Sequence, residues 1–293
     1  MQREISIVKD LFSLIKLIGF FAKEKPTIIH ANTPKGGLLS LIAAWVCRVP
    51  NRLYFVHGLR YQGTEGLKKT LLMFMEGLSC KFATKVFSVS NGVKEVLLED
   101  QITKKPINVI WNGSINGIDL DFFNPALIDA SQLKAEYSIG KEDFVFGFVG
   151  RLVSDKGINE LVASFAKLNL RFPNTKLLLV GPIESNLDPL LPETLKEINS
   201  NNKIISTGYQ SDVRLFYKMM NLFVFPSYRE GFGISLMEAS AMNVPSISSN
   251  IIGCNEVISP TINGNLILPK NQEALFHSME HALLHTEEVK KMA

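Results

Sequence analysis

Two glutamates toward the end of the chain, Glu230 and Glu238, lie just before and inside a predicted helix, and such carboxylates can bind sugar hydroxyls. An apolar run at 222–225 leads to Glu230, and Glu238 lies in a predicted helix at 234–241. A carboxylate can accept two hydrogen bonds from a ribose diol or from sugar hydroxyls. Backbone amides at the start of that helix can hold a phosphate. The turn between strand and helix contains Gly231, Phe232 and Gly233. The alternative is a helix-capping glutamate followed by a glutamate on the helix surface.

Two cations follow another predicted strand. The run at 144–149 ends at Gly150, and Arg151 and Lys156 lie in the loop after it. Both side chains can neutralise the diphosphate of a nucleotide, whose charge grows as the bond to it breaks. The alternative is two solvated cations in an ordinary loop.

Two histidines follow predicted strands in the first half of the chain. His57 ends the strand at 52–57, which places it at the carboxyl edge of a parallel sheet, where such sheets bind ligands. His30 ends the strand at 27–30, and Lys35 lies shortly after it, before two glycines. Lys35 can contact an anionic group or belong to an ordinary turn. A structural role for His57 is the alternative.

Two further patterns resemble metal sites, but we assign them to structure. Asp119 and Asp121 form a D-x-D sequence after Asn-Gly, where aspartate serves as a turn and capping residue. Histidines recur every four residues on a predicted helix, a spacing that can bind zinc. These histidines are His277, His281 and His285. No carboxylate or cysteine partner is evident beside them, so we interpret them as a solvated helix face and expect no metal site.

Short apolar runs alternate with helical patterns along the whole chain, which is typical of parallel sheets built from strand–helix–strand units. The other predicted strands are 85–90, 107–111, 176–180, 203–207, 244–248 and 266–268. The other predicted helices are an amphipathic helix at 3–25, then 36–47, 67–82, 91–98, 157–172, 188–199, 211–220 and one from residue 271.

A turn-rich and then polar passage at 112–141 separates two alternating halves. We therefore predict an α/β protein of two doubly wound, Rossmann-like domains, residues 1–138 and 139–293, that face each other across a cleft. The first half opens with a helix, without a preceding strand and glycine-rich turn, and the last helix lacks a capping signal. We expect the first domain to be incomplete.

The composition narrows the possible functions. The chain is 46% hydrophobic and 20% charged, as in a folded globular protein. A net charge of +3 without basic clusters argues against nucleic-acid binding. Three scattered cysteines indicate a reducing cytoplasm. No apolar run is long enough to span a bilayer.

Together these residues resemble the retaining glycosyltransferases of family 4, which have the GT-B fold. The resemblance runs from about residue 5 to residue 285 and includes Glu230 and Glu238 as an E-x7-E motif. It implies Glu230 near the donor sugar or its diphosphate and Glu238 on the nucleotide ribose. It also implies Arg151 and Lys156 on the diphosphate and His57 near the donor sugar. The implied catalytic residues are therefore His57, Arg151, Lys156 and Glu230. The implied nucleotide-binding set is Gly150, Gly208, Tyr209, Gly231, Phe232, Gly233 and Glu238.

The nearest branch by resemblance is that of bacterial capsule, O-antigen and N-glycan transferases, which share stretches like those at 30–37 and 113–119. It implies hexosyl transfer from a nucleotide-diphosphate sugar with retention. We expect transfer without metal, because the two cations and the helix start can do a metal's electrostatic task. The resemblance also implies a glycan acceptor linked to a lipid such as undecaprenyl diphosphate, and an enzyme in the cytoplasm, at the inner face of the plasma membrane. We expect residues 59–74 to lead a peripheral membrane contact, and residues 3–25 to pack on the sheet.

The sequence departs from the family pattern at three places. The first strand and the C-terminal helix of the family are missing, and Asn221 stands where aspartate is common. A donor-binding remnant that has lost catalysis and a GT-B sugar-nucleotide epimerase are therefore alternatives. The epimerase would share the fold and Arg151, although the E-x7-E motif argues for the transferase. A glycosidase would also use two carboxylates, but such pairs lie roughly 5–10 Å apart, whereas eight helical residues span about 12 Å.

Overall fold

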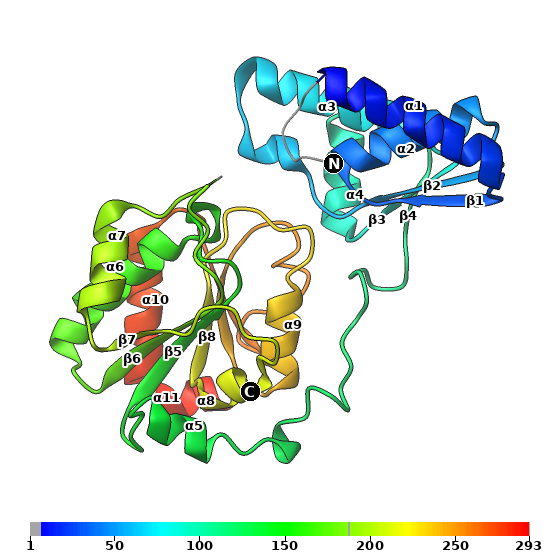
Figure 1. Ribbon diagram of the computed structural model, residues 1–293. Coiled ribbons are helices and arrows are strands. Elements are labelled where there is room, and N and C mark those ends of the chain that lie inside the picture. The colour runs from blue at the N-terminus through cyan, green and yellow to red at the C-terminus, as the bar shows by residue number, and fades with distance from the viewer. Residues whose placement is uncertain (1–6, 187, 293) are drawn as a thin grey trace. The chain divides into compact units, whose positions relative to one another are not determined.

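The computed structural model describes residues 7–186 and 188–292, which form two compact units that divide between Asn116 and Gly117 (Figure 1). This division lies upstream of the boundary predicted between residues 138 and 139. The connecting segment belongs to the second unit because helix α8 (Arg214–Met219) holds it. Nη1 of Arg214 donates to the carbonyl of Phe122 at 3.2 Å, and Nζ of Lys218 donates to the carbonyl of Pro125 at 2.8 Å.

The first unit is built on a parallel sheet with the strand order β1-β2-β3-β4. These strands are β1 (Ile28–Ala31), β2 (Asn51–Val56), β3 (Lys85–Ser88) and β4 (Ile107–Val109). The helices are α1 (Ile7–Glu24), α2 (Pro34–Val46), α3 (Gly66–Phe82) and α4 (Asn91–Glu99), with a short 3₁₀ helix η1 (Arg60–Gly63). Each predicted strand and helix of this half is present, although residues 3–6 of the first helix lie outside the described residues. The strand order is sequential, so the reversal of a doubly wound sheet is not seen among these strands.

The packing of α1 differs from the prediction. Helix α2 lies between α1 and α3, and α1 packs on α2 through Leu14, Ile18 and Phe21. Leu11 and Ile15, two apolar residues of the same amphipathic helix, are exposed. The apolar arc of α1 is wider than its contact with α2, so only part of that arc is covered.

The second unit contains a six-stranded parallel sheet with the order β10-β9-β8-β5-β6-β7. Its strands are β5 (Phe144–Val149), β6 (Thr175–Val180), β7 (Ile204–Ser206), β8 (Leu222–Phe225), β9 (Ser246–Ser249) and β10 (Gly264–Ile267). Strands β5 and β8 are buried along their whole length, as expected for continuous apolar runs covered on both faces. The direction of strand addition reverses between β5 and β8, which makes this sheet doubly wound, as predicted.

Helices cover both faces of this sheet (Figure 1). They are α5 (Ser131–Glu136), α6 (Ile158–Arg171), α7 (Pro192–Ser200), α8, α9 (Ile234–Ala241), α10 (Gln272–Leu284) and α11 (Thr286–Lys290), with 3₁₀ helices η2 (Pro125–Leu127) and η3 (Ser154–Lys156). The core lies between sheet and helices and includes Phe146, Phe165 and Phe223. Among the described residues, no helix combines the length and the apolar character needed to cross a membrane.

Candidate functional site

The site lies where the strand order of the second sheet reverses. The loops after β5 (150–157) and after β8 (226–233) leave the sheet side by side, and we call them together the switch-point site. Ligands of open α/β sheets bind at such a point, outside the carboxyl strand ends. Gly157 has a φ of 70°, and a Cβ atom there would lie 2.2 Å from the carbonyl oxygen of Pro226. Only glycine therefore allows the two loops to approach this closely.

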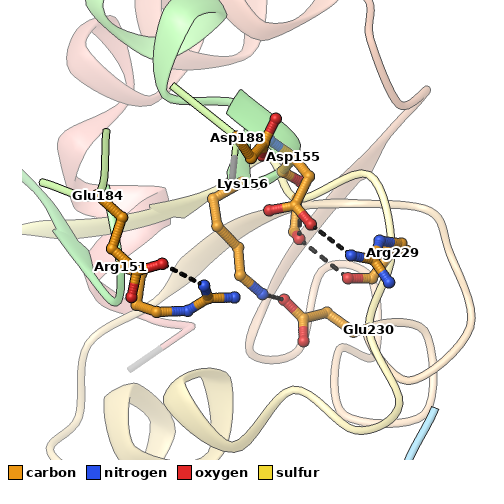
Figure 2. Close-up of polar contacts among 8 residues, drawn as sticks. Arg151, Asp155, Lys156, Glu184, Asp188, Arg229 and Glu230 are labelled. Atoms are coloured by element: carbon orange, nitrogen blue, oxygen red, sulfur yellow. Dashed lines mark hydrogen bonds and ion pairs between the residues drawn. The ribbon is translucent and has the colours of Figure 1, made fainter. Parts of the chain in front are cut away.

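Lys156 and Glu230 form an ion pair across the two loops (Figure 2). Their side chains are only 16% and 14% exposed, and Nζ of Lys156 lies 5.7 Å from the ring centroid of Phe225. The structure thus brings together two residues predicted for the site. Lys156 is not a solvated loop cation, and Glu230 is neither a helix cap nor a free surface carboxylate.

Arg151 borders this pair but is more open. Its side chain is 45% exposed, and Nη1 donates to Oε2 of Glu184 at 2.8 Å (Figure 2). Glu184 follows β6, so it comes from a third loop at the same edge of the sheet. The exposed guanidinium can exchange this carboxylate for the phosphate of a ligand, because both are bound by the same two-pronged geometry.

Asp155 connects the loops of the site, a role that the sequence analysis missed. Its carbonyl accepts from the amide of Tyr228 at 2.8 Å, and its Oδ2 accepts from Nη2 of Arg229 at 2.8 Å. Its amide donates to Oδ2 of Asp188 at 2.6 Å. The only signal in the sequence is its position next to Lys156, and its partners are distant in the chain.

Glu238 lies on α9, with Oε2 accepting a hydrogen bond from the hydroxyl of Tyr217 at 2.9 Å. Burial raises the pKa of the Glu238 carboxyl, and the bond from Tyr217 partly opposes this effect. Tyr217 is fully buried, so it holds the carboxylate in one orientation. The sequence identified Glu238 but could not identify this partner on α8.

The start of α9 is less open to a phosphate than predicted. The amide of Gly233 donates to the carbonyl of Gly253 at 3.1 Å, and those of Ile234 and Leu236 donate to carbonyls of the same turn. Gly253 has a φ of 80°, and a Cβ there would lie 2.8 Å from the Gly231 carbonyl. The turn of Gly231 and Phe232 is therefore held against Gly253. These bonds leave fewer amides for a phosphate, which increases the part that the two cations would have in binding a diphosphate.

Gly150, Gly208 and Tyr209 lie beside the same edge. The amide of Gly150 donates to the carbonyl of Val180, and the carbonyl of Gly208 accepts from the amide of Gly181, both at 2.9 Å. Tyr209 follows with a largely exposed ring. The loops after β5, β6 and β7 are thus joined by backbone hydrogen bonds, and Tyr209 offers a flat surface next to them.

His57 belongs to the first unit. Its Nε2 lies 3.0 Å from Oδ1 of Asn32, and its ring stacks on Phe55. Burial, and to a lesser degree His30, lowers the pKa of His57, which favours the neutral imidazole. Lys35, singled out as a possible anion contact, forms an ion pair with Asp10 at 2.6 Å.

The D-x-D sequence at Asp119 and the histidine pattern, both assigned structural roles above, differ in how the structure bears on them. Oδ1 of Asp119 accepts from the amides of Asp121 and Phe122 at 3.0 and 3.1 Å, which confirms its role in a turn. The histidine pattern does have a carboxylate neighbour, because Glu288 lies 3.7 Å from His285. The sequence missed it because the chain leaves the helix at His285.

Comparison with known proteins identifies the family of this chain. The sequence pattern described as "Glycosyl transferases group 1" matches residues 129–293, and that described as "Glycosyltransferase Family 4" matches residues 5–121. The chain belongs to the group 1 glycosyl transferases. This confirms the family resemblance.

Two relatives of this group 1 glycosyl transferase match along most of its length. It is 37% identical to the capsular polysaccharide biosynthesis glycosyltransferase CapM of Staphylococcus aureus, over 90% of this chain and 68% of that protein. It is 30% identical to the UDP-Gal:alpha-D-GlcNAc-diphosphoundecaprenol alpha-1,3-galactosyltransferase of Escherichia coli, again over 90% and 68%.

A solved structure supports the fold. Anabaena Alr3699/HepE in complex with UDP-glucose has a TM-score of 0.80 at 22% identity, over 95% of this chain and 74% of that chain. The predicted GT-B class, with two parallel-sheet α/β domains, is therefore confirmed.

Proposed function

We propose that this glycosyl transferase moves a sugar, with retention of its anomeric configuration, from a nucleotide-diphosphate sugar to a lipid-linked glycan. The observation that carries the proposal is the little-exposed Lys156–Glu230 pair at the switch point, with Arg151 open beside it. Two cations meet at the edge of the sheet where a nucleotide diphosphate would bind. Two cations in this place can stabilise the charge of a leaving diphosphate.

In this proposal each residue has a distinct role. Lys156 and Arg151 bind the diphosphate, Glu230 lies near the donor sugar, and Glu238 accepts hydrogen bonds from the ribose diol. The leaving phosphate assists removal of the proton from the acceptor hydroxyl. His57, held neutral by burial, orients the sugar and does not attack it. The rest of the nucleotide-binding set is Gly150, Gly208, Tyr209, Gly231, Phe232 and Gly233.

The acceptor is inferred from the relatives. The Escherichia coli protein is named for a sugar on diphosphoundecaprenol, and the Staphylococcus aureus protein for capsular polysaccharide. We infer an acceptor of the same kind, used in surface polysaccharide synthesis at the cytoplasmic face of the membrane. A sugar-nucleotide epimerase and a donor-binding remnant without turnover remain the alternatives to transfer.

A direct assay separates these possibilities. The protein is incubated with a panel of UDP- and GDP-sugars, with and without undecaprenyl-diphosphate-linked acceptors, and the products are analysed by NMR. We expect a product that forms only with acceptor and keeps the anomeric configuration of the donor. An inverted product would contradict retention. A donor isomerised without acceptor would indicate the epimerase, and binding without turnover would indicate the remnant.

Glu238→Ala should weaken nucleotide binding. The loss of charge-assisted hydrogen bonds to the ribose is worth about 1–3 kcal/mol, which is roughly a 5- to 150-fold rise in Kd. Calorimetry with the nucleoside diphosphate measures it, and Glu142→Ala, an exposed carboxylate near the start of β5, is the control. Tyr217→Phe should cause a smaller loss, because it frees the Glu238 carboxylate without removing it. An unchanged Kd in Glu238→Ala would remove Glu238 from the site.

Transfer should survive chelation of metal ions. Arg151 and Lys156 supply the positive charge that a divalent ion provides in other transferases, and Asp119 is engaged in a turn. We therefore expect the same initial rate with and without excess EDTA. A rate lost in EDTA and restored by manganese would show that the reaction needs a metal.

We further propose a peripheral membrane contact led by α3. Leu67 and Phe74 are 91% and 62% exposed, and Lys68 and Lys69 are exposed beside them. Apolar side chains flanked by lysines favour the surface of an anionic membrane. The exposed Leu11 and Ile15 on α1 can add to this contact.

Flotation with anionic liposomes tests the contact. The protein should float at low salt and less at high salt, because the lysine contribution is screened. Leu67→Glu with Phe74→Glu should abolish flotation, whereas Leu11→Glu with Ile15→Glu should reduce it less. Wild-type protein that stays at the bottom at low salt would favour a soluble acceptor.

A further inference from the structure

A group of metal-ligating side chains lies where the chain passes from α10 to α11. His281 is in the last turn of α10, His285 lies between the helices, and Glu288 is on α11. The amide of His285 donates to the carbonyl of His281 at 2.9 Å, and the amide of Glu288 donates to the carbonyl of His285 at 3.0 Å. These backbone bonds bring the three side chains to one place.

The distances suit a small metal ion. The rings of His281 and His285 stack with centroids 4.2 Å apart, and Nδ1 of His285 lies 3.7 Å from Oε1 of Glu288. One ligand atom from each of the three residues lies within 4.8 Å of the others. Zinc–ligand bonds of about 2.0–2.2 Å place tetrahedral ligand atoms roughly 3.3–3.5 Å apart. Exposed side chains can close the difference by small rotations.

We propose that His281, His285 and Glu288 bind a divalent transition-metal ion, best matched by zinc, and that the ion links α11 to α10. Two imidazoles and one carboxylate are a ligand set typical of zinc and of other divalent first-row transition metals, whereas magnesium and calcium prefer oxygen ligands alone. All three side chains are exposed, so water can complete the tetrahedron.

This site is separate from the switch-point site. Helix α11 lines a cavity of about 520 Å³ through Thr286 and Val289, together with Phe144, Thr175 and Asn221. These last three residues lie at or beside the amino ends of β5, β6 and β8, whereas the switch-point loops follow the carboxyl ends. The ion therefore has a structural role, and its removal should leave transfer unchanged.

Stabilisation by the ion follows from where it binds. Helix α11 has five residues, and its one buried side chain is Val289. A helix this short has little stability of its own. An ion that binds only the folded arrangement stabilises it by mass action. The bound ion should also stabilise the second unit as a whole, because α10 packs on α6 through core residues such as Phe276 and Met279.

Calorimetric titration of the chelator-treated, full chain with zinc chloride tests the proposal. We expect one ion per chain, and at least about a tenfold rise in Kd for His281→Ala, His285→Ala and Glu288→Gln, since even outer-shell partners of metals have effects of this size. The control is His277→Ala, an exposed histidine one turn earlier whose ring lies near Glu273 and Glu280. Magnesium chloride should give no heat of binding.

Hydrogen exchange locates the bound ion. Zinc should slow exchange of the amides at 285–290 in the wild type and not in the His281→Ala/His285→Ala double variant. Equal zinc affinity in the double variant would overturn the proposal, and would direct attention to other ligands such as the part-buried Cys47. Binding without slower exchange at 285–290 would contradict the link between the helices.

Discussion

Lys156→Ala should reduce turnover by about 10²- to 10³-fold, the scale measured when one group that stabilises a developing negative charge is removed. Lys156 is held near the strand ends by Glu230 and by the ring of Phe225, so its charge is already in place before the donor binds. Its removal also leaves the Glu230 carboxylate, only 14% exposed, without its cation. Both consequences act on the step in which the diphosphate leaves.

The measurement is kcat for transfer, beside the Kd of the nucleoside. We expect the nucleoside Kd to change by only a few-fold, because the partner of Lys156 is the diphosphate and not the base or ribose. Arg151→Ala should also lower kcat more than it changes the nucleoside Kd. Its loss of kcat should be smaller than that of Lys156→Ala, since the Arg151 side chain is 45% exposed. The control is Lys196→Ala, an exposed lysine on α7. A kcat for Lys156→Ala within about twofold of wild type would exclude this role.

The second large effect is expected on the stability of the first unit and involves Glu76. This side chain is 4% exposed on α3, where Oε1 accepts from the hydroxyl of Tyr54 at 2.7 Å. Burial raises the pKa of Glu76 from 4.5 to about 7, and the bond from Tyr54 partly opposes the rise. The folded unit therefore holds a proton that the unfolded chain has released between these pH values.

Glu76 makes the folded first unit less stable as the pH rises. The contribution of Glu76 is fully favourable below about pH 4.5 and is lost as the pH rises through about 7. Between pH 4.5 and pH 8 the loss is roughly 3 kcal/mol. Glu76→Gln keeps an acceptor for Tyr54 and cannot ionise. Its unfolding free energy relative to wild type should therefore rise by about this amount from pH 4.5 to pH 8.

Urea unfolding followed by tryptophan fluorescence measures this effect selectively. Both tryptophans of the chain, Trp45 and Trp111, belong to the first unit. Glu95→Gln, an exposed glutamate on α4, is the control and should keep the wild-type pH dependence. Tyr54→Phe should make the dependence steeper, because the bond that favours the ionised carboxylate is lost. An identical pH profile in wild type and Glu76→Gln would contradict the assignment.

The sequence by itself determined most of the strands and helices and the α/β class of the fold. The apolar runs at β5 and β8 were predicted to the residue, because a strand buried on both faces needs an unbroken apolar run. Sequence patterns also singled out Arg151, Lys156, Glu230 and Glu238 as candidate site residues. Positions just after strands or early in the following helix are close in space wherever parallel strands share an edge.

Tertiary structure alone decided the partners of these residues. The contacts of Lys156 with Glu230 and of Glu238 with Tyr217 join segments that are distant in the chain, and no local pattern encodes them. The link from Asp155 to Arg229 also joins distant segments. Which part of α1 is exposed depends on how much of α1 is covered by α2. Glu288 approaches His285 because the helix ends there, a local break that periodicity did not predict. Sequence patterns determine which face a residue takes, whereas packing determines which side chain it meets.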